Sequence, residues 1–125
     1  MVLVDTSIWI RFLAGGKSFA RELDRLLEQN EVVGHELVYG ELLIGDRGGR
    51  AKLLEPYARM HQAATVAHAE VVTFAHSRQL LGRGLGWIDV HLLASAVLAR
   101  LRLWTADASL AGAALQLGIA HELGG

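Results

Sequence analysis

Short apolar runs alternate along the chain with longer segments whose apolar residues recur at helical spacing. The first run, residues 1–4, is apolar throughout, which predicts a strand buried on both faces. It ends at Asp5, after which Thr6 and Ser7 supply helix-capping side chains and apolar residues return at helical spacing. Asp5 therefore stands where a buried strand passes into a helix. In open α/β sheets, ligands bind at this carboxyl end of the strands.

The same pattern predicts further strands and helices to the end of the chain. Strands are predicted at 31–34, 65–66, 102–105 and 119–123. Helices are predicted at 6–14, 18–30, 37–44, 50–60, 68–81, 87–101 and 109–117, with Pro56 as a point of kinking or interruption. The helix at 87–101 is apolar nearly all round, so we expect it to be buried. Strands alternating with helices predict one α/β domain over residues 1–125, with a central parallel sheet of short strands flanked by helices.

Composition restricts the function more than the fold. The formal net charge of −1 favours no polyanion, so any contact with one needs a local basic patch. The chain has no cysteine, which excludes disulfides and thiolate metal sites and suits a cytoplasmic protein. No apolar run approaches the ~18 residues of a membrane span, and no signal peptide is expected. The hydrophobic fraction of 52% leaves apolar surface to spare, which favours a dimer or a permanent partner.

Four carboxylates have neighbours that do not favour charge. Asp5 ends the first strand, Glu41 lies within an apolar helix, Asp89 lies near the start of the apolar helix at 87–101, and Asp107 follows a strand. Burying a carboxylate costs several kcal/mol unless it is paired or bound to a metal. Hard oxygen ligands without cysteine favour Mg²⁺ or Mn²⁺ over zinc. The four acids therefore predict a divalent-cation site suited to phosphodiester chemistry.

A structural alternative stays open for three of these acids. Asp5, Asp89 and Asp107 each lie where an aspartate can cap a helix or favour its dipole. Glu41 lies mid-helix and has no capping role. The other nine acids are expected on solvated faces, the six histidines show no metal-ligand spacing and are given no role, and Trp9 is expected in the core or an interface.

Four segments in order resemble the PIN-domain family, and specifically the VapC toxins of bacterial and archaeal toxin–antitoxin pairs. They are residues 4–7 (VDTS), 40–45 (GELLIG), 89–96 (DVHLLASA) and 105–107 (TAD). The resemblance implies a PIN-like fold and a Mg²⁺- or Mn²⁺-dependent endoribonuclease. It also implies a homodimer and a VapB-like antitoxin that blocks the acidic pocket. After residue 107 the chain departs from the family, because Ala-Ser-Leu follows where an aromatic residue is common.

Residue roles follow from the same resemblance. Asp5 and Asp89 would be the main metal ligands, and Glu41 and Asp107 would complete the acidic pocket. Two polar residues, Thr6 and Thr105, would orient a ligand or a water beside the metal.

The basic residues nearest the acids are the candidates for the RNA backbone. They are Arg11, Arg47, Arg50 and Arg83. The alternative function is a catalytically silent PIN-like binding or scaffold domain. It predicts that at least one of the four acids is missing, and all four are present. A different Mg²⁺-dependent α/β enzyme, such as a phosphatase or a receiver domain, is the other alternative, but neither Lys17 nor Lys52 is placed for a receiver site.

Overall fold

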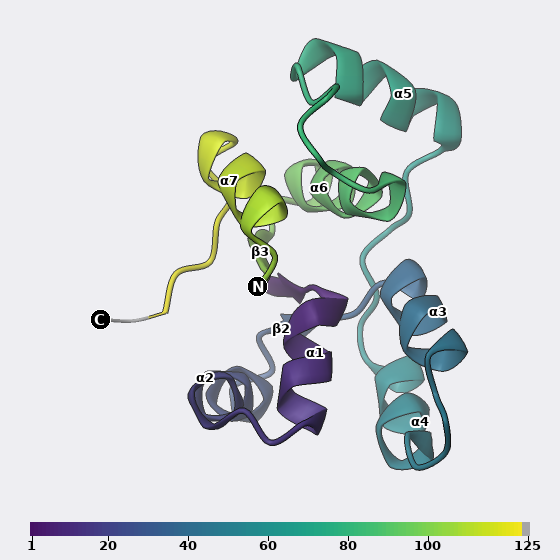
Figure 1. Cartoon of the computed structure of the whole chain (residues 1–125), viewed down its shortest axis with the longest axis vertical. Coiled ribbons are helices and arrows are strands. Elements are labelled where there is room, and N and C mark those ends of the chain that lie inside the picture. The colour runs from purple at the N-terminus through teal and green to yellow at the C-terminus, as the bar shows by residue number, and fades with distance from the viewer. Residues whose placement is uncertain (124–125) are drawn as a thin grey trace.

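A three-stranded parallel sheet lies at the centre of the computed structural model, which is described here over residues 1–123 (Figure 1). The strand order is β2-β1-β3, with β1 at Val2–Val4, β2 at Val32–Val33 and β3 at Arg102–Trp104. Within the sheet, Leu3 is in register with Val33 on one side and Leu103 on the other. The predicted α/β class and parallel sheet are confirmed.

Seven helices surround the sheet in the described part of the chain (Figure 1). Three pairs pack together, α1 with α2, α3 with α4 and α5 with α6, and α1 also contacts α3. The helices are α1 Thr6–Leu13, α2 Lys17–Glu28, α3 Glu36–Ile44, α4 Ala51–Arg59, α5 His68–Ser77, α6 Trp87–Ala99 and α7 Ala108–Gln116. No helix within residues 1–123 is both long and apolar enough to cross a membrane.

The predicted strand at 65–66 is wrong. The pairing occurs earlier, where a single parallel bridge joins Gly34 to Gln62 and the Ala63 N–H donates to the Gly34 carbonyl at 2.8 Å. A Cβ at Gly34 would collide with the Gln62 side-chain amide, so glycine permits this approach. The predicted strand at 119–123 is reduced to one bridge, between Leu103 and Ala120.

Two further predictions concern the helices. α4 runs through Pro56 without interruption. The proline removes one amide donor from the helix, but the buried side chains of Leu54 and Tyr57 anchor the helix in the core. The middle of α6 is buried as expected. Its ends are not, because Trp87 is 43% exposed and Leu98 is 67% exposed.

Candidate active site

Asp5 follows the central strand and is held by hydrogen bonds on one carboxylate oxygen. Its side chain is 5% exposed, and Oδ2 accepts from the Ser7 hydroxyl at 2.7 Å and the Thr105 hydroxyl at 2.8 Å. The Ser7 N–H donates to the same oxygen at 3.4 Å, which caps α1. Each hydroxyl has a single proton and gives it to Asp5, so the group acts as a carboxylate acceptor. Its orientation is fixed before any ligand arrives.

The same two hydroxyls fasten the loop after β3 to the start of α1. The Ala106 N–H donates to Ser7 Oγ at 2.9 Å, and the Asp107 N–H donates to Thr105 Oγ1 at 3.0 Å. Neither hydroxyl has a spare proton for the other, although their oxygens lie 3.2 Å apart. The network therefore brings the backbone of Asp107 to the side of Asp5. Ser7 was predicted to cap the helix, but the N-cap of α1 is Asp5, and Ser7 instead orients the Asp5 carboxylate.

Glu41 reaches the site from α3 through a hydroxyl of α1. Thr6 Oγ1 donates to Glu41 Oε1 at 2.7 Å in a part-buried position. The contact spans the packed pair α1 and α3, so the helix that begins beside Asp5 also orients Glu41. Both threonines of the predicted polar pair, Thr6 and Thr105, thus donate to carboxylates of the predicted set.

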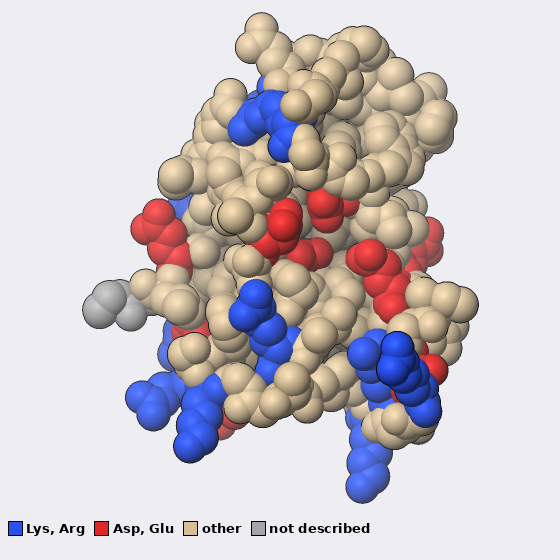
Figure 2. All heavy atoms as spheres, in the orientation of Figure 1, with Lys and Arg blue, Asp and Glu red and all other residues tan. Residues whose placement is uncertain are grey.

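Asp89 lies in the first turn of α6, and the charges of two other acids influence its pKa. Burial raises the pKa of Asp89, the Gly86 N–H that donates to Oδ2 at 2.9 Å opposes this rise, and the charges of Asp5 and Asp107 raise the pKa further. Ion pairs within residues 1–123 involve none of the four acids. Figure 2 shows acidic side chains gathered in a hollow across the middle of this face, with basic side chains above and below it. Negative charge is therefore concentrated there without a cationic partner.

The capping interpretation is also correct. Asp5 caps α1, Asp107 caps α7 through the Leu110 N–H at 3.0 Å, and Asp89 binds the N–H at the start of α6. Only one oxygen of each carboxylate has a partner within residues 1–123. Capping and site formation are compatible, because a cap fixes one oxygen and leaves the other for a ligand.

The apolar neighbours of the four acids in the sequence do not mean that all four side chains are buried. Asp5 is buried, Glu41 and Asp89 are half-buried, and Asp107 is exposed. The reason is position in the fold, since Asp107 begins a helix on the surface while Asp5 ends the central strand.

The donor set fits a hard divalent cation in chemistry and charge. All its donors are carboxylate oxygens, which Mg²⁺ and Mn²⁺ prefer. As the side chains stand, no three His, Asp or Glu residues among positions 1–123 are grouped closely enough to hold a metal ion. The site therefore offers oriented oxygen donors without a preformed coordination shell.

The four candidate arginines differ in their surroundings. Arg50 donates from Nη1 to the Leu42 carbonyl at 2.8 Å, which secures the end of α3. The guanidinium of Arg11 lies 5.5 Å from the centre of the Phe19 ring, toward the end of α1 away from Asp5. Arg47 is exposed in the loop after α3, and Arg83 is half-buried in the loop before α6. Arg83 is therefore the candidate that directly precedes a helix carrying a site acid.

His35 contacts both helices that carry Glu41 and Asp89, although no histidine was predicted to have a role. Its side chain is fully buried, and Nδ1 accepts from the Leu37 N–H at 3.1 Å, which caps α3. The neutral ring therefore donates from Nε2 to Ser95 Oγ of α6, 3.0 Å away. Burial lowers the pKa of His35. The signal in the sequence was its place two residues before the predicted helix at 37–44.

Glu22 was expected on a solvated face and is buried instead. Arg25 donates to its carboxylate at 2.6 Å, and His121 Nε2 lies 2.8 Å from the other oxygen. The Arg25 hydrogen bond lowers the pKa of Glu22 against the opposing effect of burial. His121 lies 99 residues from Glu22 in the sequence, so no local sequence pattern predicts this contact.

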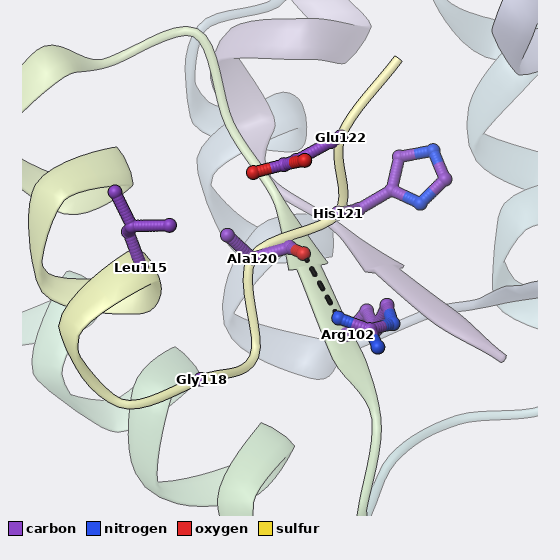
Figure 3. Close-up of a pocket in the computed structure, with 6 residues that line it drawn as sticks. All are labelled: Arg102, Leu115, Gly118, Ala120, His121 and Glu122. Carbon is purple, nitrogen blue, oxygen red and sulfur yellow. Dashed lines mark hydrogen bonds between the residues drawn. The ribbon is translucent and has the colours of Figure 1, made fainter. Parts of the chain in front are cut away.

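A separate hollow of about 410 Å³ lies beside this cluster (Figure 3). Arg102 lines it and donates to the Ala120 carbonyl at 3.1 Å. Arg102 begins β3, whereas Asp5 and Asp107 come after the carboxyl ends of β1 and β3. The hollow is therefore not part of the acidic site.

Comparison with known proteins agrees with this geometry. The model of the PIN domain matches residues 2–116. Ribonuclease VapC32 of Mycobacterium tuberculosis, from strain CDC 1551 / Oshkosh and from strain ATCC 25618 / H37Rv, is 40% identical over 121 residues, which cover 96% of this chain and 95% of the relative. A match of this extent, on a fold that gathers its acids at one end of a parallel sheet, means that the chain belongs to the PIN-domain family, among the VapC proteins.

Proposed function

We propose that the chain is an endoribonuclease of the VapC type, which hydrolyses phosphodiester bonds in RNA with the help of Mg²⁺ or Mn²⁺. The observation that carries the proposal is the charge repulsion that Asp5 and Asp107 exert on Asp89. None of the three acids forms an ion pair with a cationic side chain among residues 1–123. A protein that gathers carboxylates in this way pays a desolvation cost that a bound cation relieves. The relatives named above are ribonucleases by name.

Asp5 and Asp89 would hold the cation, with Glu41 and Asp107 completing the acidic site. When bound, the cation supplies positive charge for the phosphoryl oxygens and increases the acidity of an attacking water. Ser7 and Thr105 keep the Asp5 carboxylate oriented.

Glu41 or Asp107 would accept the proton of the attacking water, and the contacts of Glu41 suit this role. Thr6 occupies its Oε1, and Oε2 has no hydrogen-bond partner within residues 1–123. A carboxylate held at one oxygen and free at the other can take the proton of an attacking water as a general base.

The partners follow from the VapC assignment. We propose a VapB-like antitoxin that inserts a basic side chain among the site acids, which would neutralise the charge that the site otherwise reserves for a metal. A homodimer is part of the proposal, and it is supported by apolar side chains left on the surface, among them Leu43 and Ile44, which are 51% and 88% exposed.

The test is cleavage of a mixed RNA pool by the purified chain with Mg²⁺, with Mn²⁺ and with EDTA. Asp5→Asn should abolish cleavage, whereas Asp24→Asn, at an exposed position of α2, is the matched control and should not. Cleavage that is undiminished in EDTA would reject the metal. If the wild-type chain cuts no RNA but still binds an antitoxin, the scaffold alternative is correct.

A further inference from the structure

Hydroxyl groups connect the segments that carry three of the four site acids, and Asp89 is the exception. The hydrogen bonds of Thr6, Ser7 and Thr105 described above make these connections. Among residues 1–123, the Asp89 side chain bonds only to the Gly86 N–H, at the start of its own helix. The position of Asp89 relative to the other acids therefore depends on how α6 as a whole is held.

The helices α6 and α3, which carry Asp89 and Glu41, pack mainly on different neighbours. α6 packs on α5 and β3, whereas α3 packs on α4 and α1 (Figure 1). Within residues 1–123, a single hydrogen bond joins α6 to the segment of another helix. It runs between Ser95 Oγ, in the middle of α6, and Nε2 of His35, the N-cap of α3, over 3.0 Å. This bond is the direct polar connection between the two acid-bearing helices.

The direction of this hydrogen bond is fixed by the other ring nitrogen of His35. Nδ1 accepts from the Leu37 N–H at 3.1 Å, so the neutral ring carries its proton on Nε2 and donates it to Ser95. His35 is 0% exposed and Ser95 is 1% exposed. Because solvent does not reach either partner, loss of one leaves a buried polar group unpaired.

The backbone of His35 is held from a third helix. Its N–H donates at 2.9 Å to the hydroxyl of Tyr57 in α4, and the Tyr57 side chain is buried. Burial raises the pKa of Tyr57, its hydrogen bond with the His35 backbone lowers it, and the charge of Asp5 raises it. Because the Asp5 charge acts on the hydroxyl that His35 binds, the contacts of His35 lie near the acidic site. His35 is therefore fixed in place close to the acids.

The spacing of the acids makes the placement of α6 important for a cation. Divalent cations bind carboxylate oxygens at about 2.0–2.6 Å. Among residues 1–123, no three acidic or histidine side chains are grouped closely enough to do this as they stand. A contact that sets the distance between α3 and α6 therefore changes the free energy of closing the site around a cation. Removal of outer contacts that orient metal ligands typically weakens metal binding about 10–100-fold.

We propose that His35 is a positioning residue of the metal site, which holds the helix of Asp89 at a set distance from the helix of Glu41 by donating to Ser95. The proposal rests on the metal-dependent function proposed above and adds the pair of residues that sets the affinity for the cation. The imidazole is fully buried and bonds to no acid, so it acts through the two helices rather than on the cation or the RNA.

Two substitutions break the hydrogen bond and leave the cap of α3 in place. Ser95→Ala removes the acceptor and does not touch α3. His35→Asn keeps a side chain that caps a helix well, but this side chain is too short to reach α6. Leu26→Val is the control for a small loss of core packing, because Leu26 is 1% exposed in α2, a helix that carries none of the four acids.

The affinity for the cation is measured without RNA, by titrating Mn²⁺ into each chain and following free Mn²⁺ by electron paramagnetic resonance. Urea melts in EDTA establish which variants are folded, and either single variant suffices for the test. We expect each to weaken Mn²⁺ binding about 10-fold, and Leu26→Val to bind as the wild type does. The double variant should weaken binding no further, because both substitutions break the same bond.

Cleavage gives a second readout. The Mn²⁺ concentration for half-maximal activity should rise by a similar factor in Ser95→Ala and His35→Asn. Saturating Mn²⁺ should restore most of kcat, because the affinity for the cation is what the hydrogen bond sets.

The outcomes separate this proposal from the proposed function. If the wild type binds Mn²⁺ and cuts no RNA, while the variants bind Mn²⁺ more weakly, the positioning role stands and the nuclease is rejected. If the wild type cuts RNA and the variants bind Mn²⁺ as tightly as it does, the positioning role is overturned and the nuclease stands. Additive losses in the double variant also overturn the positioning role, since the two residues would then act independently. If the wild type does not bind Mn²⁺, both the metal site and the positioning role are rejected.

Discussion

Asp5 has two functions that substitution can separate, because it both caps a helix and carries charge into the site. Asparagine caps a helix about as well as aspartate. Its Oδ1 can accept the same bonds from Ser7 and Thr105 that Asp5 Oδ2 accepts now. The substitution weakens charge-assisted hydrogen bonds and removes repulsion toward the neighbouring acids. We therefore expect Asp5→Asn to change the free energy of unfolding by less than about 1 kcal/mol.

Alanine at the same position removes the acceptor altogether. Loss of the cap costs about 1 kcal/mol. The Ser7 and Thr105 hydroxyls, both part-buried, lose the acceptor of their protons, at the lower end of about 1–3 kcal/mol each. Asp5→Ala should therefore destabilise the chain by about 2–4 kcal/mol.

The assay is urea unfolding of both variants beside an RNA cleavage measurement. The midpoint of Asp5→Asn should stay near that of the wild type, with an unchanged m-value, while cleavage falls at least about 100-fold. The midpoint of Asp5→Ala should fall in proportion to its lost stability. If Asp5→Asn lowers the urea midpoint as much as Asp5→Ala does, the hydrogen bonds accepted by residue 5 are not what stabilises this part of the fold. If Asp5→Asn still cleaves RNA, the charge of the carboxylate is not required.

Four other measurements test the site and its supports. Thr6→Val removes the hydroxyl that orients the α3 carboxylate and should lower kcat about 10-fold, with Thr6→Ser close to wild type. His35→Ala should lower the free energy of unfolding by about 2–4 kcal/mol. Because folding lowers the pKa of His35, the stability of the wild type in urea melts should be complete above pH ~6.5 and should fall as the pH drops below it. At pH 7 in EDTA, Asp89→Asn should raise the melting temperature, because the raised pKa of Asp89 means that the fold disfavours its ionised form. The same substitution should remove any stabilisation of the chain by added Mg²⁺. Arg83→Gln should reduce the salt dependence of RNA binding by about one unit of slope, whereas Arg21→Gln should leave it unchanged.

The pattern of apolar residues was sufficient to predict the central strand and the helix after it. Residues 1–4 are apolar without interruption, and Thr6 and Ser7 follow as polar residues suited to a helix start, so both elements are specified locally. The helices were predicted for the same reason, and their ends were less well defined than their presence. The strand at 65–66 failed because two residues with β propensity do not form a ladder unless a partner edge is available, and the neighbouring edge pairs with Gln62 instead.

The sequence by itself determined the α/β class and the identity of four acids whose order resembles a known family. Tertiary structure decided what holds those acids, because the contacts that orient them cross long sequence distances, as Thr105 does with Asp5 and Thr6 with Glu41. It also decided burial, which separates Asp5 from the exposed Asp107. The physical reason is that local propensity depends on neighbours in the chain, whereas burial and hydrogen-bond partners depend on which segments the packed core brings together.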